Sequence, residues 1–296
     1  MTEAEPSPRS HPAIIMRTLL LLAALLARPT WSLQTTRPPS NVRLVILPGF
    51  GNDSSDYTPP GSLVSSLEAR GWKDIAVLDV KRLDWLQVFV NGLFDPLFWA
   101  GNMPPTRPSF AWYLDRIRNE IERSEDKVVL VAHSAGGWLA RAALGFLGLD
   151  NRVLGLVSLG APHLPPPPTV MDMTRGALRI THETFPGSYH KNMFYITVIG
   201  NSVAGVEQER KAPWEPTSVS GFAFNSYEAV CGIGSALGDG VVPLCAAHLD
   251  DSVALELPGV YHSINAPDQW YGSNGILDQW HDSLVAELQT TLTEQS

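Results

Sequence analysis

The chain has 296 residues, of which 44% are hydrophobic, and this is enough to bury a sizeable core. Its 21 Lys and Arg and 30 Asp and Glu give a net charge of −9 at pH 7. This balance argues against a nucleic-acid partner, because binding to phosphates requires clustered basic side chains.

The first 40 residues are typical of a targeting presequence. Residues 18–27 (TLLLLAALLA) form an apolar block after Arg17 that is too short to span a bilayer but suits the hydrophobic region of a signal peptide. No acidic residue occurs between Glu5 and Asp53, and Arg, Ser, Thr and Pro are frequent, as in organelle transit peptides. We therefore predict a plastid location through a two-part presequence, with the secretory pathway as the alternative, and we exclude residues 1–40 from the folded domain.

From residue 41 onward, expected strands alternate with expected helices. The strands are continuous aliphatic runs that end in turn residues, and the helices have apolar residues at helical spacing. In chain order we expect strand 42–47, helix 62–70, strand 75–80, helix 111–123, strand 127–132, helix 138–146, strands 153–159, 193–199 and 252–257, and helix 275–292. This alternation predicts one α/β domain over residues 41–296, with a mostly parallel sheet and helices on both faces.

Three stretches interrupt the alternation and are predicted to be insertions. They lie at about 82–110, 163–191 and 201–237. Loops of this length in a compact domain are uncommon and often form lids or binding loops. The first stretch contains Trp85, Phe89 and Trp99. Two interpretations of it stay open: a buried helix that packs on the sheet, or the wall of an apolar pocket.

The strongest local signal is the segment 132–136 (AHSAG), between an expected strand and an expected helix. It matches the G-x-S-x-G nucleophile elbow of the α/β-hydrolase fold, with Ala132 at the first Gly position. The nucleophile sits on a cramped turn, so the residues two before and two after it must be small. We therefore predict that Ser134 is a nucleophile. A purely structural turn is the alternative.

The turn 48–51 (PGFG) follows the first expected strand. In the α/β-hydrolase fold, one donor to the oxyanion comes from a loop after a strand and the other from the residue after the nucleophile. We predict that the backbone N–H groups of Phe50 and Ala135 are these donors. The side chains of Phe50 and of His133, inside the elbow, are candidates to line the pocket with the aromatic residues of the first insertion. A plain glycine turn is the alternative for 48–51.

Two later segments, 238–243 (GDGVVP) and 260–263 (VYHS), supply an acid and a base. The α/β-hydrolase fold requires the chain order Ser, acid, His, and Ser134, Asp239 and His262 follow it. We predict that His262 is the general base and that Asp239 orients and stabilises its imidazolium form. The competing residues are His248 as the base, and Asp250 or Asp251 as the acid.

Five segments together resemble the lipase-like α/β-hydrolases related to GPI inositol-deacylases and lecithin–cholesterol acyltransferase-like lipases, and especially a plastid-predicted subgroup of plants and algae. They are LPGFGNDSSDY (47–57), VVLVAHSAGGWLAR (128–141), SLGAPH (158–163), GDGVVP (238–243) and GVYHS (259–263). The resemblance covers roughly residues 42–285. It implies catalytic roles for Ser134, Asp239 and His262, and an ester or lipid substrate. Ala132 and Pro48 stand where many relatives have Gly and His.

The motifs favour hydrolysis of a carboxylic ester, such as that of a lipid, through an acyl-enzyme. Two alternatives stay open: an acyltransferase with the same three residues, and a non-catalytic binding protein on the same fold. We expect a small-molecule partner, contact with a membrane surface, and no metal or organic cofactor. Cys231 and Cys245 bracket Asp239, and both a disulfide and two buried free thiols stay open.

Overall fold

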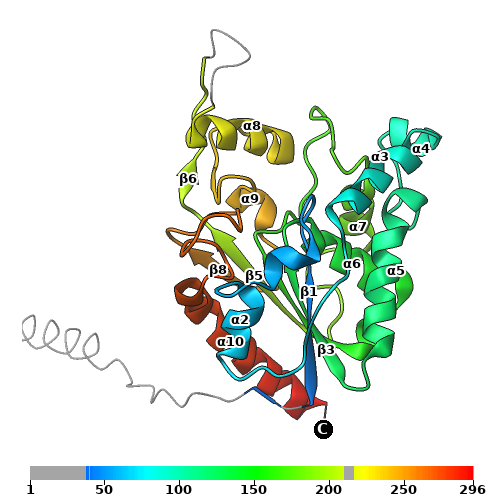
Figure 1. Cartoon of the computed structure of the whole chain (residues 1–296). Coiled ribbons are helices and arrows are strands. Elements are labelled where there is room, and N and C mark those ends of the chain that lie inside the picture. Colours follow the sequence, from blue (N-terminus) through cyan, green and yellow to red (C-terminus); the bar gives the residue numbers. More distant parts are fainter. Residues whose placement is uncertain (1–37, 40, 210–216, 296) are drawn as a thin grey trace, which may run out of the picture. The chain divides into compact units, whose positions relative to one another are not determined.

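Figure 1 shows the computed structural model of the chain, which describes residues 38–39, 41–209 and 217–295. The predicted presequence therefore lies outside the described residues, except for positions 38–39. Among the described helices, none has the length and the apolar composition needed to cross a bilayer.

The centre of the fold is a six-stranded parallel sheet with the strand order β2-β1-β3-β4-β5-β8. Its strands are β1 (Val42–Leu47), β2 (Ile75–Val77), β3 (Lys127–His133), β4 (Val153–Leu159), β5 (Phe194–Gly200) and β8 (Val253–Leu257). The four middle strands are buried almost throughout, because their continuous aliphatic sequences suit a sheet that is covered on both faces. A short antiparallel pair, β6 (Val203–Ala204) and β7 (Leu237–Gly238), lies outside this sheet.

Helices cover both faces of the sheet, as predicted (Figure 1). On one face lie α5 (Pro108–Arg123), α6 (Ala135–Leu147) and α7 (Ala177–Thr184), and on the other lie α2 (Leu63–Glu68) and α10 (Asn274–Glu294). Each face has its own buried apolar cluster. Alternate residues of one strand belong to different clusters: Val45 packs with α5 and α6, whereas Ile46 packs with α2 and α10.

The observed element boundaries differ from the predicted ones in two informative places. β2 ends at Val77, although a strand was expected to reach residue 80. Beyond it, the carbonyl of Val80 accepts a hydrogen bond from the Ser54 N–H (2.8 Å), so this segment holds the loop after β1 rather than extending the sheet. The helix expected at 138–146 begins three residues earlier, at Ala135.

The first predicted insertion is made of short helices. It contains the 3-10 helix η2 (Arg82–Trp85), α3 (Leu86–Gly92) and α4 (Pro96–Trp99), and α3 packs against α5. Trp85, Phe98 and Phe110 are buried, whereas Phe89, Phe94 and Trp99 are exposed. The interpretation of a buried helix on the sheet therefore describes only part of it.

The other two predicted insertions also contain helices. Residues 163–191 include α7, and residues 201–237 include β6 and α8 (Val219–Cys231), while residues 210–216 lie outside the described part. The remaining elements are η1 (Ser54–Tyr57), η3 (Asp150–Arg152) and α9 (Leu244–Ala247).

The strand order reverses at β1, which has β2 on one side and β3 on the other. In open parallel sheets, ligands bind at the carboxyl ends of the strands at such a reversal. The turn 48–51 follows β1, and Ser134 follows β3. The chain after β5 leads to Asp239 and the chain after β8 leads to His262, so the topology directs all the predicted catalytic residues to one edge.

Candidate active site

Ser134 occupies a sharp turn between β3 and α6. Its backbone has φ 53° and ψ −127°, a conformation that costs a residue with a side chain of the order of 1–3 kcal/mol. The surrounding structure holds it there, since β3 is buried, α6 begins at the next residue, and the Ser134 N–H donates to the carbonyl of Leu159 (2.9 Å). This is the geometry that exposes a nucleophilic hydroxyl above a sheet.

The turn after β1 packs directly against the elbow, and two glycines make this approach possible. A Cβ on Gly49 would lie 2.7 Å from the Cβ of Ser134, and a Cβ on Gly136 would lie 2.7 Å from the carbonyl oxygen of Leu47. Both distances are shorter than a real contact allows. Ala132, by contrast, is part of the buried core, so the first position of the elbow accommodates a methyl group.

The structure brings Ser134, His262 and Asp239 together. His262 Nε2 lies 2.9 Å from Ser134 Oγ, and His262 Nδ1 lies 2.7 Å from Asp239 Oδ2. With its proton on Nδ1, where it donates to the carboxylate, the imidazole can accept the serine proton at Nε2.

The competing residues lie elsewhere. His248 pairs on the surface with Glu256 (3.0 Å). Asp250 and Asp251 lie in the turn before β8, and the exposed carboxylate of Asp251 faces Lys191 (3.4 Å). Of the candidate bases, His262 is the one that hydrogen-bonds to Ser134, and of the candidate acids, Asp239 is the one that hydrogen-bonds to His262.

Asp239 is fully buried, and four donors surround its carboxylate. Oδ1 accepts from the N–H groups of Val241 (2.9 Å) and Val242 (2.7 Å), and Oδ2 accepts from Tyr271 Oη (2.7 Å) as well as from His262. Burial alone would raise the pKa of Asp239, but His262 and the backbone donors outweigh it, so the pKa lies below its ordinary value. The carboxylate therefore stays charged beside the imidazole.

Tyr271 is a site residue that no sequence motif marked. Burial and the neighbouring Asp239 raise its pKa well above the ordinary value, so its hydroxyl stays protonated and donates. The same oxygen accepts from the N–H of Gly200 at the end of β5 (2.9 Å). Tyr271 thus joins the carboxylate to the sheet.

The two predicted oxyanion donors belong to the turn after β1 and to the residue that follows Ser134. The carbonyl of Gly49 accepts from Asn52 N–H (3.0 Å), and in a trans peptide the Phe50 N–H points to the opposite side. Ala135 is the first residue of α6, where N–H groups have no partner inside the helix. Within the described residues neither amide donates a hydrogen bond, so both are available to a developing negative charge.

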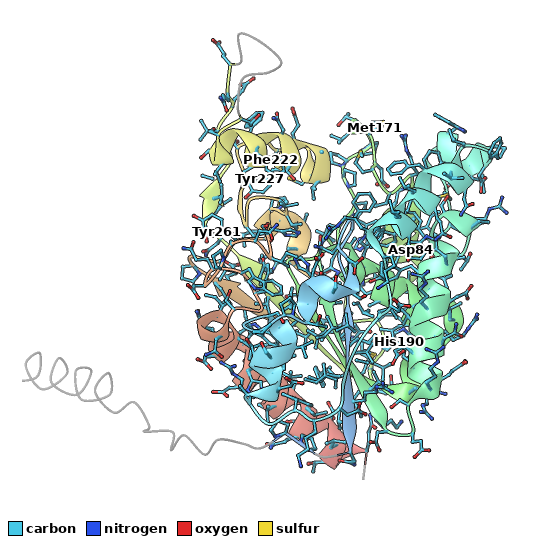
Figure 2. All side chains as sticks on the ribbon, in the orientation of Figure 1. Asp84, Met171, His190, Phe222, Tyr227 and Tyr261 are labelled. Carbon is cyan, nitrogen blue, oxygen red and sulfur yellow. The ribbon has the colours of Figure 1, made fainter. Side chains whose placement is uncertain are left out.

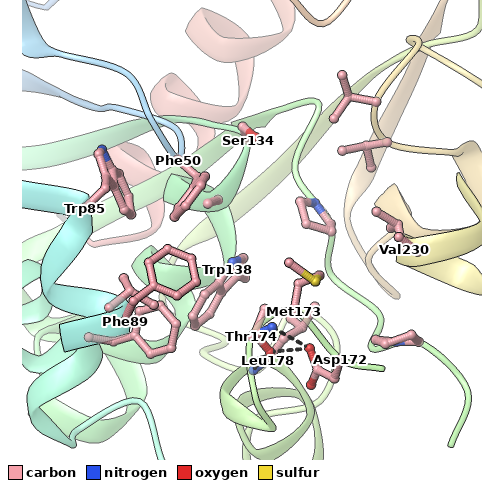
Figure 3. Close-up of a pocket in the computed structure, with 18 residues that line it drawn as sticks. Phe50, Trp85, Phe89, Ser134, Trp138, Asp172, Met173, Thr174, Leu178 and Val230 are labelled. Carbon is pink, nitrogen blue, oxygen red and sulfur yellow. Dashed lines mark hydrogen bonds between the residues drawn. The ribbon is translucent and has the colours of Figure 1, made fainter. Parts of the chain in front are cut away.

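A cavity of about 330 Å³ opens beside Ser134 (Figure 3). Its walls come from segments far apart in the chain and are almost entirely apolar. They include Phe50, Trp85, Phe89, Phe110, Trp138, Pro162, Met173, Leu178, Val230, Val241 and Val242. Its size and apolar lining are typical of a small-molecule site.

Two of the five predicted pocket residues are not in the pocket, whereas Phe50, Trp85 and Phe89 are. Trp99 projects from α4, is 60% exposed, and donates its indole N–H to the carbonyl of Leu93 (3.1 Å). His133 is buried on the other side of the elbow, because a strand residue next to Ser134 points to the opposite face.

The two cysteines are free thiols, so the alternative of a disulfide is wrong. Burial and a hydrogen bond with Cys231 raise the pKa of Cys245 to about 11, which disfavours the reactive thiolate. The alternative of two buried free thiols is wrong as to burial, because Cys231 is half-buried and Cys245 is exposed, with its thiol only partly enclosed. In the described part of the chain, no group of three His, Cys, Asp or Glu side chains is placed to hold a metal ion.

Comparison with known families identifies the fold. A family model described as "Alpha/beta hydrolase family" matches residues 44–269. The chain belongs to the alpha/beta hydrolase family. This membership confirms the fold predicted from the elbow and from the alternation of strands and helices.

Solved structures of lipases are similar to this alpha/beta hydrolase. The mature lipase BlEst2 of Bacillus licheniformis has a TM-score of 0.51 and 17% identity, covering 83% of this chain and 93% of its own. Its propeptide form has a TM-score of 0.51 and 18% identity, and the match covers 84% of this chain and 50% of the propeptide form. A monoacylglycerol lipase of Paleococcus ferrophilus has a TM-score of 0.46 and 13% identity, and the match covers 86% of this chain and 96% of the lipase. No curated protein sequence matches this alpha/beta hydrolase.

Proposed function

We propose that this alpha/beta hydrolase cleaves a carboxylic ester of a lipid through an acyl-enzyme on Ser134. The observation that carries the proposal is the line of hydrogen bonds from Asp239 through His262 to the Ser134 hydroxyl, which ends beside an apolar cavity. The resemblance of five sequence segments to lipase-like relatives supports the same substrate class.

The proposed reaction assigns each step to a residue of the site. Ser134 Oγ attacks the ester carbonyl while His262 Nε2 takes its proton, and the amides of Phe50 and Ala135 hold the oxyanion. The imidazolium, stabilised by Asp239, then protonates the departing alcohol. Water enters, gives a proton to His262 and attacks the acyl group, and the proton returns to Ser134 as the acid leaves.

The cavity favours an apolar acyl group. Asp172 is the one ionisable side chain among the residues that line it. Its carboxylate accepts from the N–H of Thr174 (2.7 Å; Figure 3) and from the N–H of Gly176 (2.9 Å). Among the described residues, no Lys or Arg lines the cavity to bind an anionic group. An aliphatic chain would therefore gain by leaving water, at roughly 25 cal/mol per Å² of buried apolar surface.

We also propose that the surface around the cavity contacts a lipid layer. The α3–α4 surface consists of exposed apolar side chains at Leu86, Phe89, Val90, Leu93, Phe94, Leu97 and Trp99. The one charged residue in this stretch, Asp95, is buried and bonded to Arg107 (2.8 Å). Exposed Met171 and Phe222 lie at the end of the molecule that carries α8 (Figure 2). Patches of this kind mark interaction sites on proteins.

The proposal is tested by hydrolysis of p-nitrophenyl esters with acyl chains from acetate to laurate. We expect measurable turnover whose kcat/KM rises with chain length, because longer chains bury more apolar surface in the cavity. Ser134→Ala should lower kcat by about 10⁴-fold or more, since the three catalytic residues act as a unit. Ser283→Ala, on α10 and away from the cavity, is the matched control.

Hydrolysis that survives Ser134→Ala would contradict the proposal. A preference for acetate over longer chains would contradict the lipid substrate while leaving the ester chemistry in place. Product analysis with an added lipid alcohol separates the two enzymatic alternatives, because an acyltransferase would form a new ester instead of a free acid.

A further inference from the structure

A buried chain of hydrogen bonds connects the turn after β1 to the backbone of His262. The N–H of Gly49 donates to Tyr57 Oη (3.1 Å), Tyr57 Oη lies 2.8 Å from His133 Nδ1, and His133 Nε2 lies 3.1 Å from the carbonyl oxygen of His262. Tyr57 and His133 are almost completely buried. These hydrogen bonds thus join Tyr57 to His133, 76 residues later in the sequence, and His133 to His262, a further 129 residues later.

The partners fix where each proton lies. A carbonyl only accepts, so His133 Nε2 carries a proton and donates it to His262. Burial, with the nearby His262, lowers the pKa of His133 to about 3, so the ring is neutral and Nδ1 must accept. Tyr57 therefore donates its single proton to His133 and accepts from Gly49. Every polar atom in this chain has a partner of the right kind.

At one end, the chain fixes the peptide that precedes the proposed oxyanion donor. The N–H of Gly49 is held by Tyr57, and the carbonyl of the same peptide, that of Pro48, accepts from Tyr113 Oη (2.7 Å). The peptide bond is planar, so two hydroxyls at its opposite sides define its orientation. The next backbone N–H along the polypeptide is that of Phe50, the proposed oxyanion donor.

At the other end, the chain fixes the backbone of the proposed general base. The His262 N–H donates to the carbonyl of Asp239 (3.0 Å), and the His262 carbonyl accepts from His133. The imidazole thus projects from a backbone held on both sides. The rings of His133 and His262 lie 4.9 Å apart, and a neutral His133 adds no charge beside the imidazolium that forms during catalysis.

We infer that Tyr57 and His133 are positioning residues that hold the Phe50 amide and the His262 imidazole in register with Ser134. The inference rests on the proposed function, because it assigns to these two residues an effect on the same reaction. Neither side chain touches the substrate, since neither lines the cavity. A displacement of about 1 Å in catalytic groups can cost about 100-fold in rate, which sets the scale of the effect.

The test measures kcat and KM for p-nitrophenyl butyrate in variants that each interrupt this series of hydrogen bonds at one place. Tyr57→Phe removes the hydroxyl. His133→Gln keeps a donor near the Nε2 position, and His133→Asn keeps an acceptor near the Nδ1 position. Tyr195→Phe is the matched control, because it loses a buried hydroxyl that accepts from the N–H of His190 (3.3 Å) outside this network.

We expect each of these three variants to lower kcat by about 10-fold and to change KM by less than about twofold. Tyr195→Phe should keep the wild-type kcat. The double variant Tyr57→Phe/His133→Gln should lose little more than the larger single loss, because both changes break the same connection. Circular dichroism and thermal melting check that each variant is folded. If one single variant does not fold, the other two still test the inference.

Folded variants with the wild-type kcat would overturn the inference. So would an equal loss in Tyr195→Phe, since that would indicate a general effect of stability, or losses that multiply in the double variant. An inactive wild-type protein would instead contradict the proposed function itself, and the two failures are therefore distinguishable.

Discussion

At the scale of single residues, burial and hydrogen-bond partners give two neighbouring histidines different parts. His133 and His262 are near neighbours, but His133 is enclosed on all sides and burial lowers its pKa to about 3. His262 instead faces the Ser134 hydroxyl and a carboxylate. The two side chains of the same type thus take different parts: one is a fixed neutral donor and the other is the proposed base.

The neutral state of His133 predicts that the protein loses stability as the pH falls. Between about pH 6.5 and 3 the unfolded chain binds a proton at this residue and the folded protein does not, so each pH unit favours unfolding by about 1.4 kcal/mol. From pH 7 to pH 5, the unfolding free energy of the wild type should fall by about 2 kcal/mol more than that of His133→Gln. Urea titrations at both pH values measure this difference, and parallel losses would contradict it.

The sequence order Ser, acid, His picked out Ser134, Asp239 and His262, which the structure places within hydrogen-bonding distance. Tyr57 and Tyr271 were missed, because a tyrosine whose partners are far away in sequence has no local pattern. His133 was assigned to the pocket on its position in the elbow. Only the alternation of side chains along β3, which sends it to the other face, could have corrected that.

At the scale of elements, the site depends on how closely α6 approaches the end of β1. Gly136 lies in the first turn of α6, where the missing side chain lets the helix touch the carbonyl of Leu47. This contact places the N-terminus of α6, with the amide of Ala135, beside the turn that carries Phe50. The packing of two elements therefore sets the distance between the two proposed oxyanion donors.

Gly136→Ala should disturb both stability and catalysis. The added Cβ would lie 2.7 Å from a backbone oxygen that cannot rotate away, so we expect a loss of about 1–3 kcal/mol in unfolding free energy and a lower kcat. Gly275→Ala, at the start of α10 with no atom within 4 Å of the new Cβ, should be neutral or slightly stabilising. Thermal melts and ester kinetics on both variants check this. Equal behaviour of the two would show that the contact is unimportant.

The elements of the central sheet could be predicted because a continuous aliphatic run that ends in turn residues is typical of a buried parallel strand. The expected bounds of β1 and β4 match the observed ones, and β3, β5 and β8 differ by one residue. The short helices α3 and α4 could not be predicted, because seven and four residues give too little periodicity to separate a helix from a loop. α3 packs against α5 and α4 packs against α3, and no local pattern encodes this packing.

At the scale of the whole molecule, charge and apolar surface act in opposite directions at a membrane. The net charge of −9 repels anionic headgroups, whereas the α3–α4 surface offers apolar side chains without exposed charge. Binding to a lipid layer would therefore depend on apolar burial. The plastid location rests only on the composition of residues 1–40 and stays a prediction.

We expect the Ser134→Ala protein to sediment with phosphatidylcholine vesicles and more weakly with vesicles that contain phosphatidylserine. Phe94→Asp or Trp99→Asp should each weaken the binding by about 10-fold, since a buried aromatic side chain contributes about 1.5–3 kcal/mol. Tyr189→Asp, beside His190 toward the other end of the molecule, is the control (Figure 2). Unchanged binding in both surface variants, or a preference for anionic vesicles, would contradict a lipid-facing α3–α4 surface.

The central claim is that Asp239 and His262 activate the hydroxyl of Ser134, and the rate and position of a fluorophosphonate adduct test it most directly. Intact-mass and peptide mass spectrometry should find a single adduct on Ser134. Its formation should slow by at least about 10³-fold in Asp239→Asn, which would hold the imidazole in the wrong tautomer, and stay unchanged in Asp251→Asn. An adduct on another residue, or labelling of Asp239→Asn at the wild-type rate, would contradict the account.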